Sequence, residues 1–202
     1  SQDKKKGPKA FTEVITDEAV SMQGMVTVHR QEDKYFFEIP DSIFGRDIMA
    51  VTRVAKTPTG AGYGGEQANR QVIRFERGPS DKVFLRVINY INVSSDSIQP
   101  IYQAVRNSNV DPIVGAFDIK ALRKDTSAVI DVTSFFNDPN QAFSLPPITE
   151  QRYNLKKLEK DRSYIESIRA YPINVEVRSV RTYSVNPPKL SQLRERPGRF
   201  DP

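Results

Sequence analysis

The sequence of 202 residues contains no cysteine and a single histidine, His29. Without cysteine, the chain cannot carry a thiolate nucleophile, a disulfide framework, an iron–sulfur cluster or a cysteine-based zinc site. A zinc site of two or three histidines is excluded too, and a serine–histidine pair would have to use His29. Because residues 25–30 alternate like a strand, we expect His29 to be an exposed side chain at a strand end.

Long apolar runs are missing as well. No stretch approaches the roughly 18 consecutive apolar residues that a spanning helix needs. The beginning of the sequence, Ser1-Gln2-Asp3-Lys4-Lys5-Lys6, lacks the apolar stretch of a signal peptide. With 38% hydrophobic and 27% charged residues, the composition predicts a globular protein that is not transmembrane, with one sizeable core or two small ones.

The positive charge lies at the two ends of the chain. The net charge is +5, of which residues 1–9 carry +3 and residues 189–202 carry +2, so residues 10–188 are neutral. A groove that follows a nucleic-acid backbone would need this charge on the folded body. We therefore expect solvated basic tails and no nucleic-acid partner.

Strand-like alternation dominates the rest of the chain. Predicted strands cover residues 25–30, 34–39, 48–54, 71–77, 82–93, 113–119, 127–132, 155–158 and 173–183. Residues 97–107 predict a short helix and residues 133–137 a single helical turn, whereas residues 161–170 fit a short helix and a bent strand equally well. The patterns predict a mainly β or α+β fold, with antiparallel sheets arranged like a sandwich and two or three short helices.

Composition shifts suggest three segments. We expect a basic tail and short leader over residues 1–23, a β-rich domain over residues 24–188 and a basic linker over residues 189–202.

A glycine cluster, residues 60–66, is the most conspicuous local motif. A phosphate-binding loop requires Lys and Ser or Thr after its last glycine, but Glu66 follows here and would repel a phosphate. The cluster fits best as a loop between strands. In the alternative interpretation it contacts a partner or a neighbouring domain, and the candidate contact residues are then Gly62, Tyr63, Gly64 and Glu66.

Three blocks together resemble the N-terminal region of large bacterial zinc-dependent metalloproteases. They are KYFFEIPDSIFGRDIMAVTRVAK (34–56) with GAGYGGE (60–66), PIYQAVRNSN (100–109) with PIVGAFD (112–118), and DRSYIESIRAYP (161–172) with NVEVR (174–178). The resemblance covers roughly residues 11–186. In that family, a short leader and a domain of uncharacterised function precede a catalytic domain whose His-Glu-x-x-His helix binds zinc.

The resemblance implies a non-catalytic N-terminal accessory domain of a secreted metallopeptidase. His29 is followed by Arg30, Gln31 and Glu32, so no His-Glu-x-x-His motif is present and no catalytic residue, metal ligand or cofactor carries over. Zinc is expected in the parent's catalytic domain. The expected partners are that downstream peptidase domain and a peptide substrate, whose cleft this domain would help to shape.

The same resemblance implies export to the periplasm, the outer membrane or the medium of a Gram-negative cell. The passage from residue 186 to residue 202 is shorter than expected before a catalytic domain, as though the chain were truncated or a segment near residues 190–195 were missing.

Two alternatives stay open at this point. One is a free-standing periplasmic or cell-surface module that binds a peptide or a glycan. The other is a complete hydrolase that uses Ser, Asp or Glu. A reading frame that continues into a His-Glu-x-x-His helix would favour the accessory domain, and a natural stop would favour the free-standing module.

Overall fold

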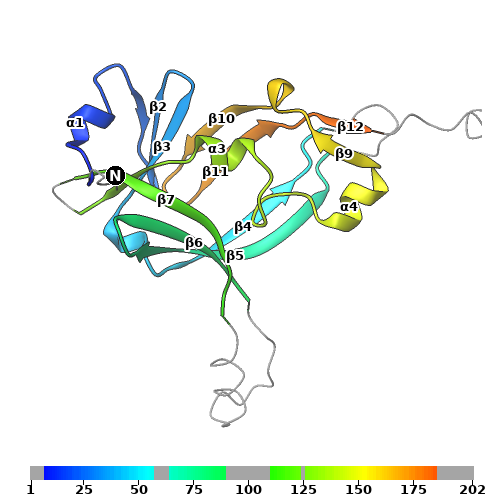
Figure 1. Ribbon diagram of the computed structural model, residues 1–202, viewed down its shortest axis with the longest axis horizontal. Coiled ribbons are helices and arrows are strands. Elements are labelled where there is room, and N and C mark those ends of the chain that lie inside the picture. The colour runs from blue at the N-terminus through cyan, green and yellow to red at the C-terminus, as the bar shows by residue number, and fades with distance from the viewer. Residues whose placement is uncertain (1–6, 57–63, 90–109, 124–125, 186–202) are drawn as a thin grey trace, which may run out of the picture.

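A computed structural model describes residues 7–56, 64–89, 110–123 and 126–185, and strands predominate in it (Figure 1). The strands are β1 (Val20–Met22), β2 (Thr27–Gln31), β3 (Lys34–Ile39), β4 (Asp47–Arg53), β5 (Gln67–Gly78), β6 (Lys82–Ile88), β7 (Ile113–Leu122), β8 (Ala128–Asp131), β9 (Leu155–Leu158), β10 (Tyr164–Ala170), β11 (Val175–Val180) and β12 (Tyr183–Val185). The described helices are α1 (Phe11–Val14), α3 (Thr133–Asn137) and α4 (Pro147–Arg152), with 3-10 turns at Asp41–Ile43 and Lys160–Arg162.

Eight of the strands form one curled antiparallel sheet in the order β1-β2-β3-β8-β7-β6-β5-β4. Hairpins build most of it, because chain neighbours such as β2 and β3 pair directly, from Thr27↔Glu38 to Gln31↔Lys34. The tight β2–β3 turn places Glu32 at a φ of 52°. The β3–β8 pairing then joins the first hairpin to the β4–β7 meander. The predicted antiparallel, mainly β fold is confirmed.

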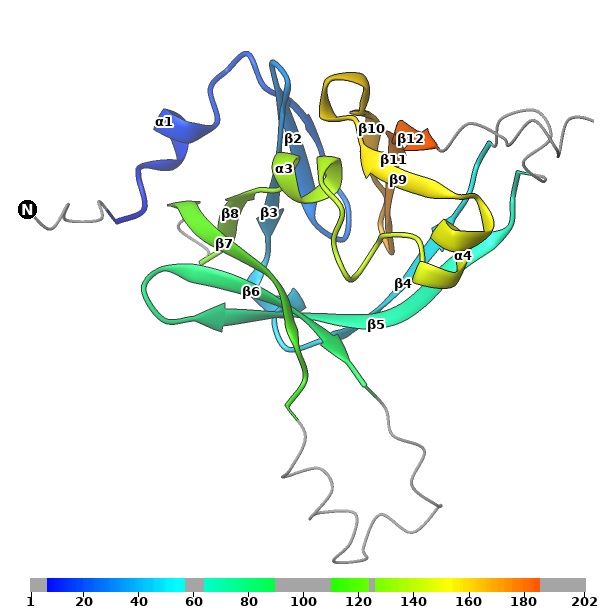
Figure 2. The ribbon, with the colours of Figure 1, turned by 45° about the vertical axis from the view of Figure 1, so that its right-hand side comes forward.

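The main core fills the concave side of the sheet. Alternate residues of β3, Tyr35, Phe37 and Ile39, point into it and are buried. From the other side α3 contributes Phe136 and the β10–β11 hairpin contributes Ile168 (Figure 2). The hairpin and α3 therefore act as the second layer of the sandwich.

A second, smaller core lies on the opposite face of β3 and its neighbours. Phe36, Ala121 and Val129 are buried there beneath α1 and the residue after it, Ile15. A register shift in the β7–β8 pair, between Ile119 and Ala121, turns Ala121 to this face. Because both faces of β3 are covered, five of its six residues are buried.

The remaining strands form two small sheets, β10–β11 and β9–β12. Residues 173–183 were predicted as one strand, but the chain changes partner: β11 pairs with β10, and β12 pairs with β9. The break falls at Thr182, whose N–H donates to Ser163 Oγ at 3.0 Å and whose hydroxyl donates to the Arg162 carbonyl at 2.7 Å. These bonds to residues 162 and 163 take the place of strand pairing at this position.

Most other predicted elements are confirmed within one to four residues. Residues 161–170 form a 3-10 turn followed by a bent strand with a register shift between Ile165 and Ser167, so the strand alternative is correct. The helical turn at 133–137 is α3. Three short elements, α1, β1 and α4, were not predicted. The predicted helix at 97–107 and the end of the predicted strand 82–93 lie outside the described residues.

Candidate functional site

The glycine cluster connects β4 to β5, as the sequence predicted for a loop between strands. Gly65 donates its N–H to the Val54 carbonyl at 2.7 Å, and Val54 donates in return to the Glu66 carbonyl at 2.9 Å. Gly65 has a φ of +92°, and a Cβ on Gly64 would lie 2.3 Å from the Ala55 carbonyl oxygen. Both glycines are thus required by the backbone of this connection.

The contact predicted for this cluster stays a prediction. Gly64 and Glu66 are exposed beside the ends of the two strands, whereas Gly62 and Tyr63 lie outside the described residues. What the structure adds is their neighbour, the edge strand β4. Its outer face exposes Met49 at 59% and Val51 at 42%.

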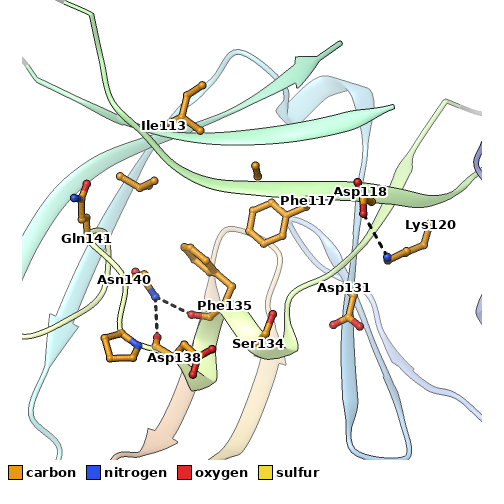
Figure 3. Close-up of a pocket in the computed structure, with 13 residues that line it drawn as sticks. Ile113, Phe117, Asp118, Lys120, Asp131, Ser134, Phe135, Asp138, Asn140 and Gln141 are labelled. Atoms are coloured by element: carbon orange, nitrogen blue, oxygen red, sulfur yellow. Dashed lines mark hydrogen bonds and ion pairs between the residues drawn. The ribbon is translucent and has the colours of Figure 1, made fainter. Parts of the chain in front are cut away.

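A groove runs along β7, and we call it the β7 groove (Figure 3). Its volume is about 630 Å³. It is lined by Ile113, Val114, Ala116, Phe117, Asp118 and Lys120 of β7, and by Asp131, Ser134, Phe135, Asp138, Pro139, Asn140 and Gln141 opposite. Such volumes are typical of binding sites for small molecules and short peptides.

One wall of the β7 groove is a strand edge. The β7 residues pair with β8 only from Ile119 to Leu122, while the segment from Ile113 to Phe117 pairs with β6 alone among the described strands. Ile119 donates its N–H to the Asp81 carbonyl, which directs its backbone toward β6. Because successive residues alternate, Ala116 turns its N–H and C=O toward the groove.

The opposite wall is fixed by a polar network around Asn140. The Asn140 side-chain oxygen accepts from the N–H groups of Ala142 and Phe143 at 3.1 and 2.8 Å, and its amide nitrogen donates to the Phe135 carbonyl at 2.8 Å. Arg181, which lies between β11 and β12, donates to the Asp138 carbonyl at 3.3 Å. The groove is therefore preformed rather than dependent on a mobile wall.

The base of the groove is aromatic, and its rim carries three aspartates together with Lys120, which lies 3.9 Å from Asp118 Oδ2 (Figure 3). The rings of Phe117 and Phe135 meet edge to face with centroids 5.2 Å apart. Asp118 and Asp138 form ion pairs, with Lys82 and Lys160 respectively, each at 2.7 Å. Asp131 accepts the Thr133 N–H at 2.9 Å, and no lysine or arginine of the described residues pairs with it.

His29 is buried, so the expectation of an exposed side chain at a strand end is wrong. It is 4% exposed because α1 covers this face of the sheet, and the Phe11 ring meets its imidazole edge to face at 5.8 Å. Its Nδ1 lies 2.7 Å from Ser21 Oγ and its Nε2 lies 3.0 Å from Glu38 Oε2. Arg123 donates to the second Glu38 oxygen at 3.0 Å.

This cluster, Ser21–His29–Glu38–Arg123, places a serine, an imidazole and a carboxylate in one hydrogen-bonded row. Every side-chain group in the row has a partner, and Arg123 also stacks over the Phe11 ring at 4.8 Å. Satisfied hydrogen bonds are what buried polar groups need for stability. The cluster therefore links the side chains of β1, β2 and β3 to Arg123 after β7, and the Phe11 ring of α1 packs on it.

Sequence reasoning missed both the β7 groove and this cluster. Glu38 offered a signal, because a carboxylate within the apolar strand Tyr35–Ile39 requires a buried partner. Asp131 offered none, since its position at the groove depends on the pairing of β8 with β3.

Two absences hold for the part of the chain that the structure describes. It contains no group of three or more His, Cys, Asp or Glu side chains that could hold a metal ion. None of its helices is long and apolar enough to cross a membrane.

The fold defines a β-rich domain in which one curled antiparallel sheet is closed by a helix and a hairpin. The chain belongs to the family described as a domain of unknown function, DUF5117, whose model matches residues 65–197. A second family model, domain of unknown function DUF5118, matches residues 8–57. No curated protein and no solved structure matches the chain.

The two matched regions do not form separate domains. The DUF5118 match (8–57) contributes β1 to β4 and the DUF5117 match (65–197) contributes β5 to β8, yet all eight strands belong to one sheet. The joining pairs are β3 with β8 and β4 with β5. The described parts of both matches therefore share one core.

Proposed function

We propose that the chain is a non-catalytic accessory domain of an exported zinc-dependent metallopeptidase and packs beside the parent's catalytic domain. The resemblance of its three sequence blocks to such proteases suggests the parent. The structural support is the edge strand β4, which presents Met49 and Val51 to solvent beside the Gly64–Glu66 turn.

An exposed edge with large apolar side chains invites pairing with another chain, and proteins commonly cover such an edge. In β4, Met49 lies opposite Val72 and Val51 opposite Arg70, so the outer face of the hairpin is partly apolar. No described segment of this chain covers it. In the proposed parent, the catalytic domain packs against this edge and against the adjoining turn.

The first test is the gene. A reading frame that continues into a His-Glu-x-x-His helix, in a protein that binds zinc, is expected. A natural stop after Pro202 would contradict the accessory role and leave a free-standing binding module as the better interpretation.

The second test compares hydrogen exchange in the 202-residue chain and in the full-length parent. We expect the β4 amides to exchange at least about tenfold more slowly in the parent, because docking closes the edge. The double variant Met49→Lys/Val51→Lys should return them to the rate of the shorter chain. Ile173→Lys, at a side chain that is 88% exposed between β10 and β11, is the matched control and should change nothing.

A further inference from the structure

We propose that the β7 groove binds an extended polypeptide segment that carries a lysine or arginine, and that this segment adds as a strand to the edge from Ile113 to Phe117. The inference deepens the proposed accessory role and rests on it for identifying the segment as peptidase substrate. The binding itself is a property of this chain and is tested on it alone.

The backbone argument comes first. Phe117 pairs with Val83 and Gly115 with Leu85, so these two residues direct their backbone groups to β6. Ala116 between them directs one donor and one acceptor into the groove. A strand added at this edge would satisfy both groups, which is how sheets commonly hold extended peptides.

The length of the edge limits the ligand. Five residues of β7 line the edge that lacks a second strand neighbour in the described structure. At about 3.3 Å per residue, they match a bound segment of about five residues, roughly 16 Å long. The groove volume of about 630 Å³ accommodates a ligand of this class.

Side-chain chemistry selects the class of segment. Phe135, which is half-buried against the buried Phe117 ring, offers an apolar surface to one ligand side chain. Opposite β7, Ser134 lies beside Phe135, and Asp131 lies on the right of the view, toward Asp118 and Lys120 (Figure 3). Asp131 is half-buried and lacks a cationic partner among the described residues. A lysine or arginine of the ligand would therefore form an ion pair with its carboxylate.

The probe is a fluorescein-labelled hexapeptide of alternating valine and lysine, and binding to the 202-residue chain is followed by fluorescence anisotropy. We expect saturable binding, and weaker binding of the hexapeptide in which glutamate replaces lysine. Two N-methylated versions, methylated at odd or at even positions, separate backbone pairing from charge attraction. Only the version whose methyl groups face Ala116 should lose binding, because alternate amides of an added strand point to the edge.

Asp131→Asn is the protein variant. Asparagine keeps the oxygen that accepts the Thr133 N–H, so the turn into α3 is retained while the charge is removed. We expect about fivefold weaker binding of the lysine peptide, as for a partly exposed ion pair, and no loss of binding of its glutamate counterpart, because the repelling carboxylate is gone. Asp33→Asn, in the exposed β2–β3 turn, is the control with the same change in charge and should bind like the wild type.

Three results would overturn the inference: no saturable binding of either peptide, equal loss of binding for both methylated versions, or equal affinity of Asp131→Asn and the wild type for the lysine peptide. None of them bears on whether the parent carries a zinc-binding helix. Conversely, a natural stop after Pro202 would remove the peptidase context while leaving peptide binding in place.

Discussion

The two faces of strand β3 differ: one contributes to the apolar core, and the other contributes to a hydrogen-bonded polar cluster. On the concave face, Phe37 and Ile39 pack among residues from seven strands, α3 and the β10–β11 hairpin. On the convex face, Phe36 joins a small apolar cluster, and Glu38 bonds His29 and Arg123. Packing density stabilises the first face, and satisfied hydrogen bonds stabilise the second. Substitutions on the two faces should therefore differ in size and in kind.

Phe37→Ala tests the concave face and should have the largest effect. The ring is 5% exposed and packs against Phe136 with centroids 5.8 Å apart, so its removal leaves a cavity at the centre of the core. We expect a loss of about 4 kcal/mol in the free energy of unfolding, measured by urea denaturation. A loss below about 1 kcal/mol would mean that α3 collapses onto the sheet and that the core is not closely packed.

Glu38→Leu tests the convex face and should cost less, about 2 kcal/mol, because it leaves His29 Nε2 buried without its partner. Arg123, whose side chain is 52% exposed, returns to water at little cost. Glu38→Gln keeps an oxygen and an amide at the same place and should recover about half of the loss. Equal unfolding free energies for the leucine and glutamine variants would show that shape, and not hydrogen bonding, matters at this position.

The sequence predicts the two faces unequally. The aromatic-rich run Tyr35–Ile39 identifies the strand, and the short polar gap at residues 31–33, between the predicted strands 25–30 and 34–39, identifies the turn before it, because both signals are local. The burial of His29 could not be predicted, since it depends on Phe11, eighteen positions earlier in the chain, folding over the sheet. Contacts between segments that are distant in the chain depend on the whole topology, so a local sequence pattern cannot predict them.

The candidate site follows the same rule. The connection at Gly64–Gly65 could be predicted from the sequence, because its positive φ and close backbone approach require glycine. The β7 groove could not be predicted from the sequence, because it exists only where β7 no longer pairs with β8 and pairs with β6 alone. A strand pattern over residues 113–119 identifies β7 but does not show which of its edges is paired.

Phe11→Ala should have the smallest effect and separates the fastening of α1 from the fold itself. The Phe11 ring is half-buried between His29 and Arg123, so its loss should lower the unfolding free energy by only about 1 kcal/mol. The local effect should be larger than the global one: amides of β1 and β2 should exchange faster, whereas those of β6 should keep their rates, because α1 covers only the convex face. If the β6 amides accelerated to the same extent, the two faces would unfold as one unit, and the contrast between a packed core and a separately fastened polar cluster would fail.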